Sequence, residues 1–146
     1  MDTPQRPLHV FLIHTHLDRS LVHRLYTRFA RDGVRAWLDA ERLMPGQDWR
    51  LEIRKAILRS DLALVFLSRR FNRHNGYCQE DLRIALKKAS LLPRGEVFLI
   101  PVRLERCQMP EPLGRWQRVD LFEADGYSRL LQSLYHHAED RGGTGL

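Results

Sequence analysis

The feature that most limits the fold of this chain is an alternation of short apolar runs with longer amphipathic segments. The run "LALVFLS" (62–68) has no polar residue before Ser68, which predicts a strand covered on both faces. Pro101 lies inside a later run and predicts a bulge or an unpaired side, because proline lacks an amide donor. The predicted strands are "HVFLIH" (9–14), "VRAWL" (34–38), "LALVFLS" (62–68), "VFLIPVRL" (97–104) and "RVDL" (118–121).

The four amphipathic segments carry apolar residues at helical spacing. The first is expected to begin at a cap formed by Asp18 and to end at Gly33, and the second to begin at Asp48. Pro93 and Gly95 stop the third. The residues expected to face the core are Leu21, Val22, Leu25 and Phe29; Trp49, Ile53, Ala56 and Ile57; Cys78, Leu82, Ala85, Leu86 and Ala89; and Leu130, Leu131, Leu134 and Ala138.

Alternating strands and helices predict an α/β domain with a parallel sheet covered by helices on both faces. Right-handed crossovers between five strands favour the flavodoxin-like order 2-1-3-4-5. At 146 residues the chain accommodates one such domain, expected over residues 8–140, with an N-terminal tail (1–7). The sequence "RGGTGL" (141–146) is typical of a flexible linker or tail, and we expect the domain to be part of a larger protein.

Composition excludes several classes of protein. No apolar run approaches membrane-spanning length, and the first ten residues do not form a signal peptide. Cys78 and Cys107 have no paired spacing, which indicates a reducing cytoplasm and neither a disulfide framework nor a metal site. The net charge of +6 raises nucleic acid as a partner, but the basic residues are spread along the chain. Direct nucleic-acid binding is therefore disfavoured, and "SRRFNRH" (68–74) stays open as a phosphate site.

In the predicted strand order, ligands bind beyond the carboxyl ends of the first and third strands. "HTHLD" (14–18) and the residues from Ser68 onward build that crevice. Two acids, Glu80 and Asp81, follow near the start of the third helix. At 100° per residue, Asp81 lies on the flank of the apolar stripe, with Tyr77 one turn before it, and Glu80 lies on the solvent side. Geometry therefore favours Asp81 over Glu80 as a crevice residue.

With these segments in place, the chain resembles a bacterial-type Toll/interleukin-1 receptor (TIR) domain from about residue 9 to residue 138. The motifs that carry the resemblance are "VFLIHTHLD", "VRAWLDAERLMPGQDW", "SDLALVFLS", "GYCQEDLRIAL" and "FLIPVRLERC". The resemblance implies the five-stranded fold described above. A receiver domain shares this fold but needs an acidic cluster after the first strand, where this chain has "HTH".

Many TIR domains cleave NAD into nicotinamide and ADP-ribose or a cyclised product, with NAD as a substrate rather than a cofactor. Their catalytic glutamate lies in a Trp-x-x-x-Glu pattern, which falls here on Tyr77 and Asp81. The resemblance therefore implies that Asp81 is catalytic, with a carboxylate one methylene shorter than that of the family, and that Glu80 is the less favoured alternative. It also implies an NAD pocket lined by His14, Thr15, His16, Trp37 and Asp39, with Ser68 beneath it. Trp37 also fits a core position, and Asp39 fits a turn cap.

Two functions compete under this resemblance. The first is an NAD-cleaving effector of prokaryotic antiviral defence, activated by self-assembly and held off by a sensor. The second is a non-catalytic interaction module that self-assembles for signalling through the loop at Met44, Pro45 and Gly46. Ile84 is expected on the solvent side of its helix and Met44 in an exposed loop, where both apolar side chains would favour weak self-association.

Overall fold

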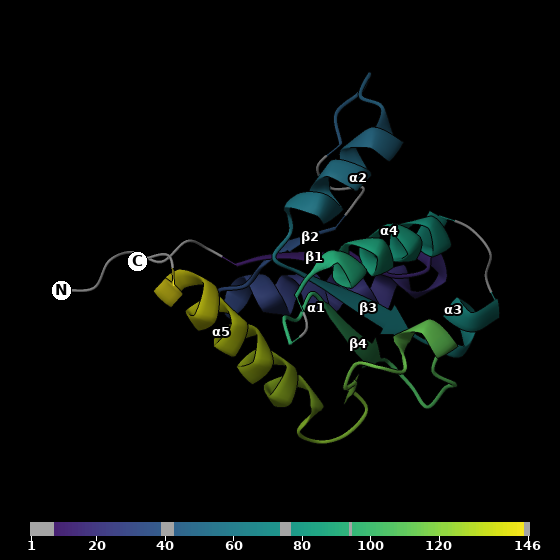
Figure 1. Ribbon diagram of the computed structural model, residues 1–146. Coiled ribbons are helices and arrows are strands. Elements are labelled where there is room, and N and C mark those ends of the chain that lie inside the picture. The colour runs from purple at the N-terminus through teal and green to yellow at the C-terminus, as the bar shows by residue number, and fades with distance from the viewer. Residues whose placement is uncertain (1–7, 39–42, 74–76, 94, 145–146) are drawn as a thin grey trace.

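The structure is a computed structural model of the 146-residue chain, and it describes residues 8–38, 43–73, 77–93 and 95–144 (Figure 1). Five parallel strands form one sheet in the order β2-β1-β3-β4-β5, which confirms the predicted order. The strands are β1 (His9–Ile13), β2 (Arg35–Trp37), β3 (Leu62–Leu67), β4 (Leu99–Arg103) and β5 (Val119–Asp120). Every residue of β3 is buried, as its uniformly apolar sequence predicts.

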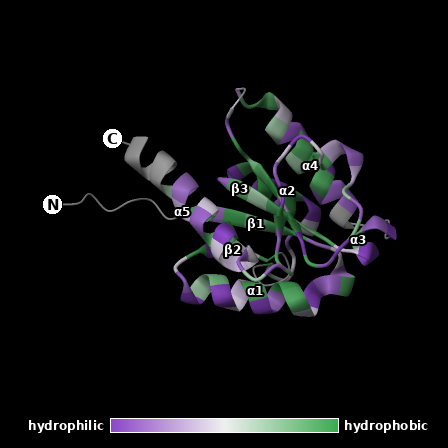
Figure 2. Ribbon diagram, turned by 90° about the horizontal axis from the view of Figure 1, so that it is seen from below, coloured by the Kyte–Doolittle hydropathy of each residue, from purple (hydrophilic) through white to green (hydrophobic). Residues whose placement is uncertain are grey.

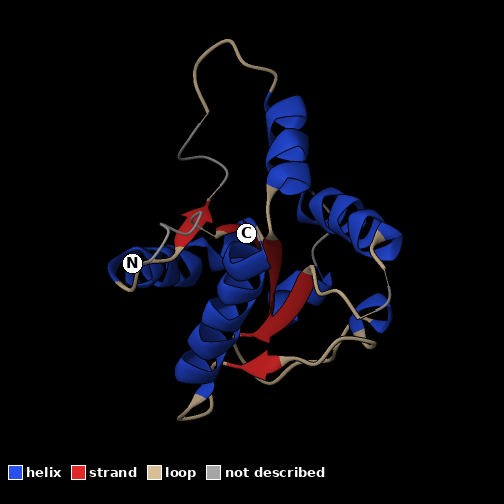
Figure 3. Ribbon diagram, turned by 60° about the vertical axis from the view of Figure 1, so that its left-hand side comes forward, coloured by secondary structure: helices blue, strands red, loops and turns tan. Residues whose placement is uncertain are grey.

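Two pairs of helices cover the two faces of the sheet (Figures 1 and 3). Helices α1 (Arg19–Arg31) and α5 (Gly126–Thr144) bury Val22, Phe29, Leu130 and Leu134 against one face. Helices α2 (Trp49–Arg59) and α4 (Tyr77–Leu91) bury Ile53, Ile57, Leu82 and Ala85 against the other. Figure 2 shows the hydrophobic strands between helices of mixed polarity, so the core consists of two apolar layers separated by the sheet.

Three short helical segments are also present among the described residues: η1 (His16–Asp18), α3 (Arg69–Arg73) and η3 (Glu111–Leu113). The basic run after Ser68, which sequence analysis left open as a phosphate site, forms α3. This helix is held by distant partners, because the Arg69 amide donates to the Glu105 carboxylate (2.8 Å) and Asn72 Nδ2 donates to the Gln108 carbonyl (2.9 Å).

The boundaries of α1 and α2 follow local sequence, apart from the predicted cap of α1. Gly33 follows α1 with a φ of 83°, and the Asp48 side chain accepts a bond from the Leu51 amide (3.4 Å) at the start of α2. Asp18 was predicted to cap α1, but its side chain makes no cap hydrogen bond. Its carboxylate instead turns into the protein, where it is only 3% exposed.

Two predicted burial assignments are wrong. Leu21 was expected in the core but is 44% exposed, because the buried stripe of α1 runs through Val22 and Phe29, and Leu21 lies about 100° away from Val22. Ile84 was expected in solvent but is partly buried and packs against the apolar cluster beneath α2 and α4. The sheet-facing stripe of α4 is thus wider than its strict helical spacing predicts.

Pro101 lies within β4 without a bulge, in continuous register with β3, where it is opposite Val65. Strand β5 pairs only with Val102 and Arg103, so the β5 side of β4 is unpaired at the proline. Of the two predicted outcomes at Pro101, a bulge or an unpaired side, the structure has the unpaired side. The missing amide hydrogen therefore leaves no strand-to-strand hydrogen bond unmade.

Helix α5 continues to Thr144, although residues 141–146 were expected to be a linker. Glycines lower helix propensity by about 1 kcal/mol each but do not forbid helix. The helix is anchored near its start, because the Tyr127 hydroxyl donates to the Asp32 carboxylate (2.7 Å). Burial and this bond raise the pKa of Tyr127 above its usual value. None of the described helices combines the length and apolar character needed to cross a membrane.

Candidate active site

Polar residues gather at the edge of the sheet where β1 and β3 end. The chain leaves β1 at His14 and turns through η1, and it leaves β3 at Ser68 and turns into α3. Thr15, Asp18 and Ser68 are 0%, 3% and 2% exposed. The two loops that sequence analysis assigned to the crevice therefore meet there, as the strand order requires.

The buried polar groups of this edge satisfy one another. Ser68 Oγ donates a short hydrogen bond to the Asp18 carboxylate and accepts one from the Phe71 amide (3.1 Å). The Asp18 amide donates to the Thr15 carbonyl (2.9 Å). Arg70 Nη1 lies 3.6 Å from the same carboxylate and donates to the Leu17 carbonyl (3.0 Å). These bonds make a preorganised floor that links η1 to α3.

His14 lies above this floor and is half-buried. Its Nδ1 lies 2.9 Å from the Thr15 carbonyl, which can only accept, so Nδ1 carries a hydrogen. Its Nε2 is buried without a hydrogen-bond partner within the described part of the chain. In the neutral ring Nε2 is then an acceptor, and a buried acceptor of this kind calls for a donor such as a ligand hydroxyl.

Two tryptophans pack against the apolar cluster on the α2 face of the sheet. Trp37, at the end of β2, is half-buried and stacks on Phe11 with ring centroids 5.2 Å apart and an interplanar angle of 16°. Trp49, the first residue of α2, packs against the same apolar cluster. Trp37 therefore takes the core position that sequence analysis left open, and it also lines a groove beside α2. Its place in an NAD pocket stays a prediction.

The two acids of α4 differ in burial as the helical wheel predicts: Asp81 is half-buried and Glu80 is exposed. Helix α4 begins near the end of the sheet toward which β3 points (Figure 1), and Asp81 lies in the second turn of that helix. Tyr77 is the first residue of α4, but its side chain lies outside the described part of the structure, as does Asp39.

The loop proposed for self-association forms a turn. The Gln47 amide donates to the Met44 carbonyl (3.1 Å), and Gln47 Oε1 accepts from the Met44 amide (2.8 Å). Gly46 has a φ of 90°, a conformation that favours glycine. Met44 is 68% exposed, as predicted, so the turn presents an apolar side chain to solvent.

Beyond α3, the ends of β4 and β5 carry an ion pair. Arg103 donates to both oxygens of Asp120, at 2.7 Å each, and to the Cys107 carbonyl (2.9 Å). The bidentate bond lowers the pKa of Asp120 and raises that of Arg103. Burial raises the pKa of Cys107, so its thiol stays protonated at neutral pH and is a poor nucleophile.

Sequence analysis included Asp18 in the crevice segment 14–18 without recognising its bond to Ser68, and it missed Arg70. Asp18 was assigned to a helix cap, and Arg70 was one of several arginines in a basic run. The available signal for Asp18 was its place after the first strand, where this fold puts polar groups of the crevice. No comparable signal identified Arg70, because its carboxylate partner is distant in sequence.

The family model for TIR domains matches residues 10–134, which is most of the chain. The chain belongs to the TIR-domain family. This assignment confirms the resemblance on which the predicted site was based, and it places the floor of Asp18 and Ser68 within the TIR fold.

Solved structures show the same fold. The TIR domain of the Toll-related receptor TRR-2 from Hydra magnipapillata has a TM-score of 0.71 and 21% identity, covering 86% of this chain and 97% of that one. The TIR domains of the activated Roq1 resistosome, which recognises the pathogen effector XopQ, have a TM-score of 0.58 and 20% identity, covering 90% and 84%. The CMP N-glycosidase BcmB of Clostridium botulinum has a TM-score of 0.54 and 16% identity, covering 85% and 98%.

A curated relative, the uncharacterized protein y4cD of Sinorhizobium fredii (strain NBRC 101917 / NGR234), is 27% identical over 146 residues. The match covers 96% of this chain but only 23% of that protein. The TIR domain thus spans about a quarter of the length of this relative.

Proposed function

We propose that this TIR domain cleaves NAD to nicotinamide and ADP-ribose, or to a cyclic ADP-ribose. The observation that carries the proposal is Asp81, a half-buried carboxylate near the start of α4 that the resemblance matches to the family's catalytic glutamate. The family includes NAD-cleaving enzymes, and the similar BcmB acts on another N-glycoside, CMP.

The chemistry required is the cleavage of one N-glycosidic bond. As the bond between ribose C1′ and the pyridinium nitrogen breaks, its electron pair passes to nicotinamide, which leaves as a neutral molecule. The ribose acquires oxocarbenium character, which a nearby carboxylate stabilises. Water then adds at C1′ and releases a proton, giving ADP-ribose, whereas attack by an adenine nitrogen gives the cyclic product.

The other residues of the edge have roles that fit this reaction. His14 Nε2 is an available acceptor for a ribose hydroxyl, and Trp37 supplies an aromatic wall for a planar ring. Thr15 and Ser68 are buried in the floor, so their contribution is to position the loops rather than to contact NAD. His16 is exposed at the rim, where it can contact the substrate from solvent.

The setting of this activity is also a proposal. We place the domain in the cytoplasm as the effector part of a larger protein of prokaryotic antiviral defence, with a sensor elsewhere in that protein or in a partner. Self-assembly through TIR contacts would activate it, which is supported by the occurrence of TIR domains in the Roq1 resistosome. Met44 at the exposed turn offers an apolar contact for such assembly.

One observation favours the second candidate, a non-catalytic interaction module. Aspartate at position 81 is one methylene shorter than the family's glutamate, and a misplacement of about 1 Å costs on the order of 100-fold in rate. The same domain would then assemble through the turn at Met44, Pro45 and Gly46 without cleaving NAD.

The deciding experiment measures free nicotinamide after incubation with NAD, at protein concentrations where light scattering detects assembly. We expect slow release by the wild-type protein and none by Asp81→Ala. Asp81→Glu should be faster than wild type, because it restores the reach of the carboxylate.

Glu80→Ala is the matched control, since it removes an adjacent but exposed acid, and its rate should change by less than about threefold. Loss of activity in Glu80→Ala alone would overturn the assignment of Asp81. Inactivity of all four assembled proteins would leave the interaction module as the function.

A further inference from the structure

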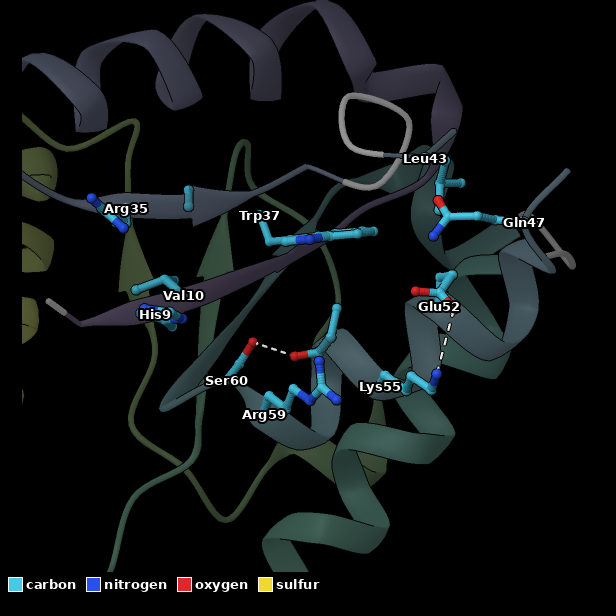
Figure 4. A pocket seen from close by; sticks show the side chains of 12 residues that line it. His9, Val10, Arg35, Trp37, Leu43, Gln47, Glu52, Lys55, Arg59 and Ser60 are labelled. Carbon is cyan, nitrogen blue, oxygen red and sulfur yellow. Dashed lines mark hydrogen bonds and ion pairs between the residues drawn. The ribbon is translucent and has the colours of Figure 1, made fainter. Parts of the chain in front are cut away.

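A groove of about 290 Å³ lies between the β1–β2 edge of the sheet and the outer flank of α2 (Figure 4). Its residues come from the strands on one side and from one face of the helix on the other, with Leu43 and Gln47 from the segment before the helix. The groove carries more cations than acids, and an aromatic ring forms part of its wall. Neither its charge nor its shape is explained by the packing of the core.

On the strand side of the groove, alternate residues of β1 and β2 point to the same face of the sheet. His9 is opposite Arg35 and Phe11 is opposite Trp37, and all four side chains lie on the same face of the sheet. The His9–Arg35 pair is thus followed by the stacked Phe11–Trp37 pair, about 6.7 Å further along the strands. Along the strand side of the groove, the cationic Arg35 is therefore followed by the aromatic ring of Trp37.

On the helix side of the groove, the lining residues are those that helical spacing places on one face of α2. Glu52, Lys55, Ala56 and Arg59 have the spacing i, i+3, i+4 and i+7 and line the groove from one side of α2. Lys55 lies 3.6 Å from Glu52, so these two charges balance one another. Arg59, the last residue of the helix, lines the groove from the side opposite to Arg35 (Figure 4).

Arg35 and Arg59 are not needed by the fold. In the part of the chain that the structure describes, neither guanidinium forms a hydrogen bond or an ion pair. The carbonyls at the end of α2, which Arg59 could have capped, already accept bonds from Lys88, at 2.7 Å for both Leu58 and Ser60. The nearby Asp61 is buried and accepts a bond from the His9 amide (2.9 Å).

We propose that this groove binds a nucleoside monophosphate. The phosphate lies between Arg35 and Arg59, which present planar donors suited to phosphate oxygens, and the base lies along Trp37. A volume of about 290 Å³ is at the small end of ligand pockets and suits a mononucleotide better than a dinucleotide. The groove is therefore a second nucleotide site, which shares Trp37 with the proposed NAD cleft but does not include Asp81.

The test is a calorimetric titration of the 146-residue protein with AMP. We expect measurable binding that falls about tenfold or more in Arg35→Gln and in Arg59→Gln, because each loses charge-assisted bonds to phosphate. Arg54→Gln is the matched control, since Arg54 is an exposed arginine of the same helix outside the groove, and it should bind AMP like wild type.

Adenosine and inorganic phosphate should each bind more weakly than AMP, because each engages only one end of the groove. Asp81→Ala should bind AMP normally, so the result stands apart from that of the NAD experiment. The proposal is overturned if AMP does not bind at millimolar concentration, or if the Arg35, Arg59 and Arg54 variants all bind it equally. Equal binding of inorganic phosphate and AMP would also overturn it, by removing the role of Trp37.

Discussion

The crevice above Ser68 and the groove beside α2 use polar residues in opposite ways. In the crevice, Asp18 is buried and bonded to Ser68 and Arg70. In the groove, the exposed Arg35 and Arg59 have no partners among the described residues. A satisfied buried network stabilises and orients the chain, whereas unpaired cations around a cavity are available to a ligand. The comparison therefore assigns Asp18 and Ser68 to the stability of the fold, and Arg35 and Arg59 to the binding of a ligand.

The largest effect is expected in the crevice, for Asp18→Ala. This variant leaves the buried Ser68 hydroxyl without its acceptor and removes the partner of Arg70. The free energy of unfolding should fall by about 3 kcal/mol, since breaking a buried polar pair by removing one member is strongly destabilising. Urea denaturation followed by circular dichroism measures this change.

Asp48→Ala is the control for Asp18→Ala, because Asp48 is an exposed aspartate that does cap its helix. Its loss should cost about 1 kcal/mol. Equal costs for the two variants would show that the Asp18 network adds nothing beyond an ordinary cap, and the contrast between crevice and groove would fail.

A smaller effect is expected for Lys88→Met, which removes the cap from the end of α2. The methionine loses the bonds to the Ile57, Leu58 and Ser60 carbonyls and the contact of Lys88 Nζ with the Phe98 ring, 4.2 Å from its centroid. The expected loss is about 1–2 kcal/mol in the same urea experiment. Lys87→Met, at the adjacent exposed position, should change stability by less than about 0.5 kcal/mol.

The fold was predictable because its signals are local and repeated. The uniform apolar run of β3 identifies a buried strand, and the right-handed crossovers leave few orders for five strands. The departures come from long-range contacts. Helix α3 depends on Glu105 and Gln108, which lie 36 residues beyond their partners, and no local pattern contains that information.

The candidate site was predictable in place but not in detail. The edge of the sheet and the difference between Asp81 and Glu80 follow from strand order and helical period. The Asp18–Ser68 bond joins residues separated by 50 positions, so the carboxylate was read as a local cap. The groove was missed for the same reason, because Arg35 and Arg59 line one groove only when α2 packs on the sheet.

The smallest effect on stability is expected for variants of the groove. This result is the most direct test of the difference between the groove and the crevice. Arg35→Gln and Arg59→Gln remove exposed charges that make no hydrogen bond or ion pair with the described residues, so each should change the free energy of unfolding by less than about 0.5 kcal/mol. Urea denaturation without ligand measures this. A loss above 1 kcal/mol in either variant would mean that the arginine supports the fold. A neutral result makes the weakened AMP binding of the same variants attributable to the groove, because the protein that binds less is then as stable as wild type.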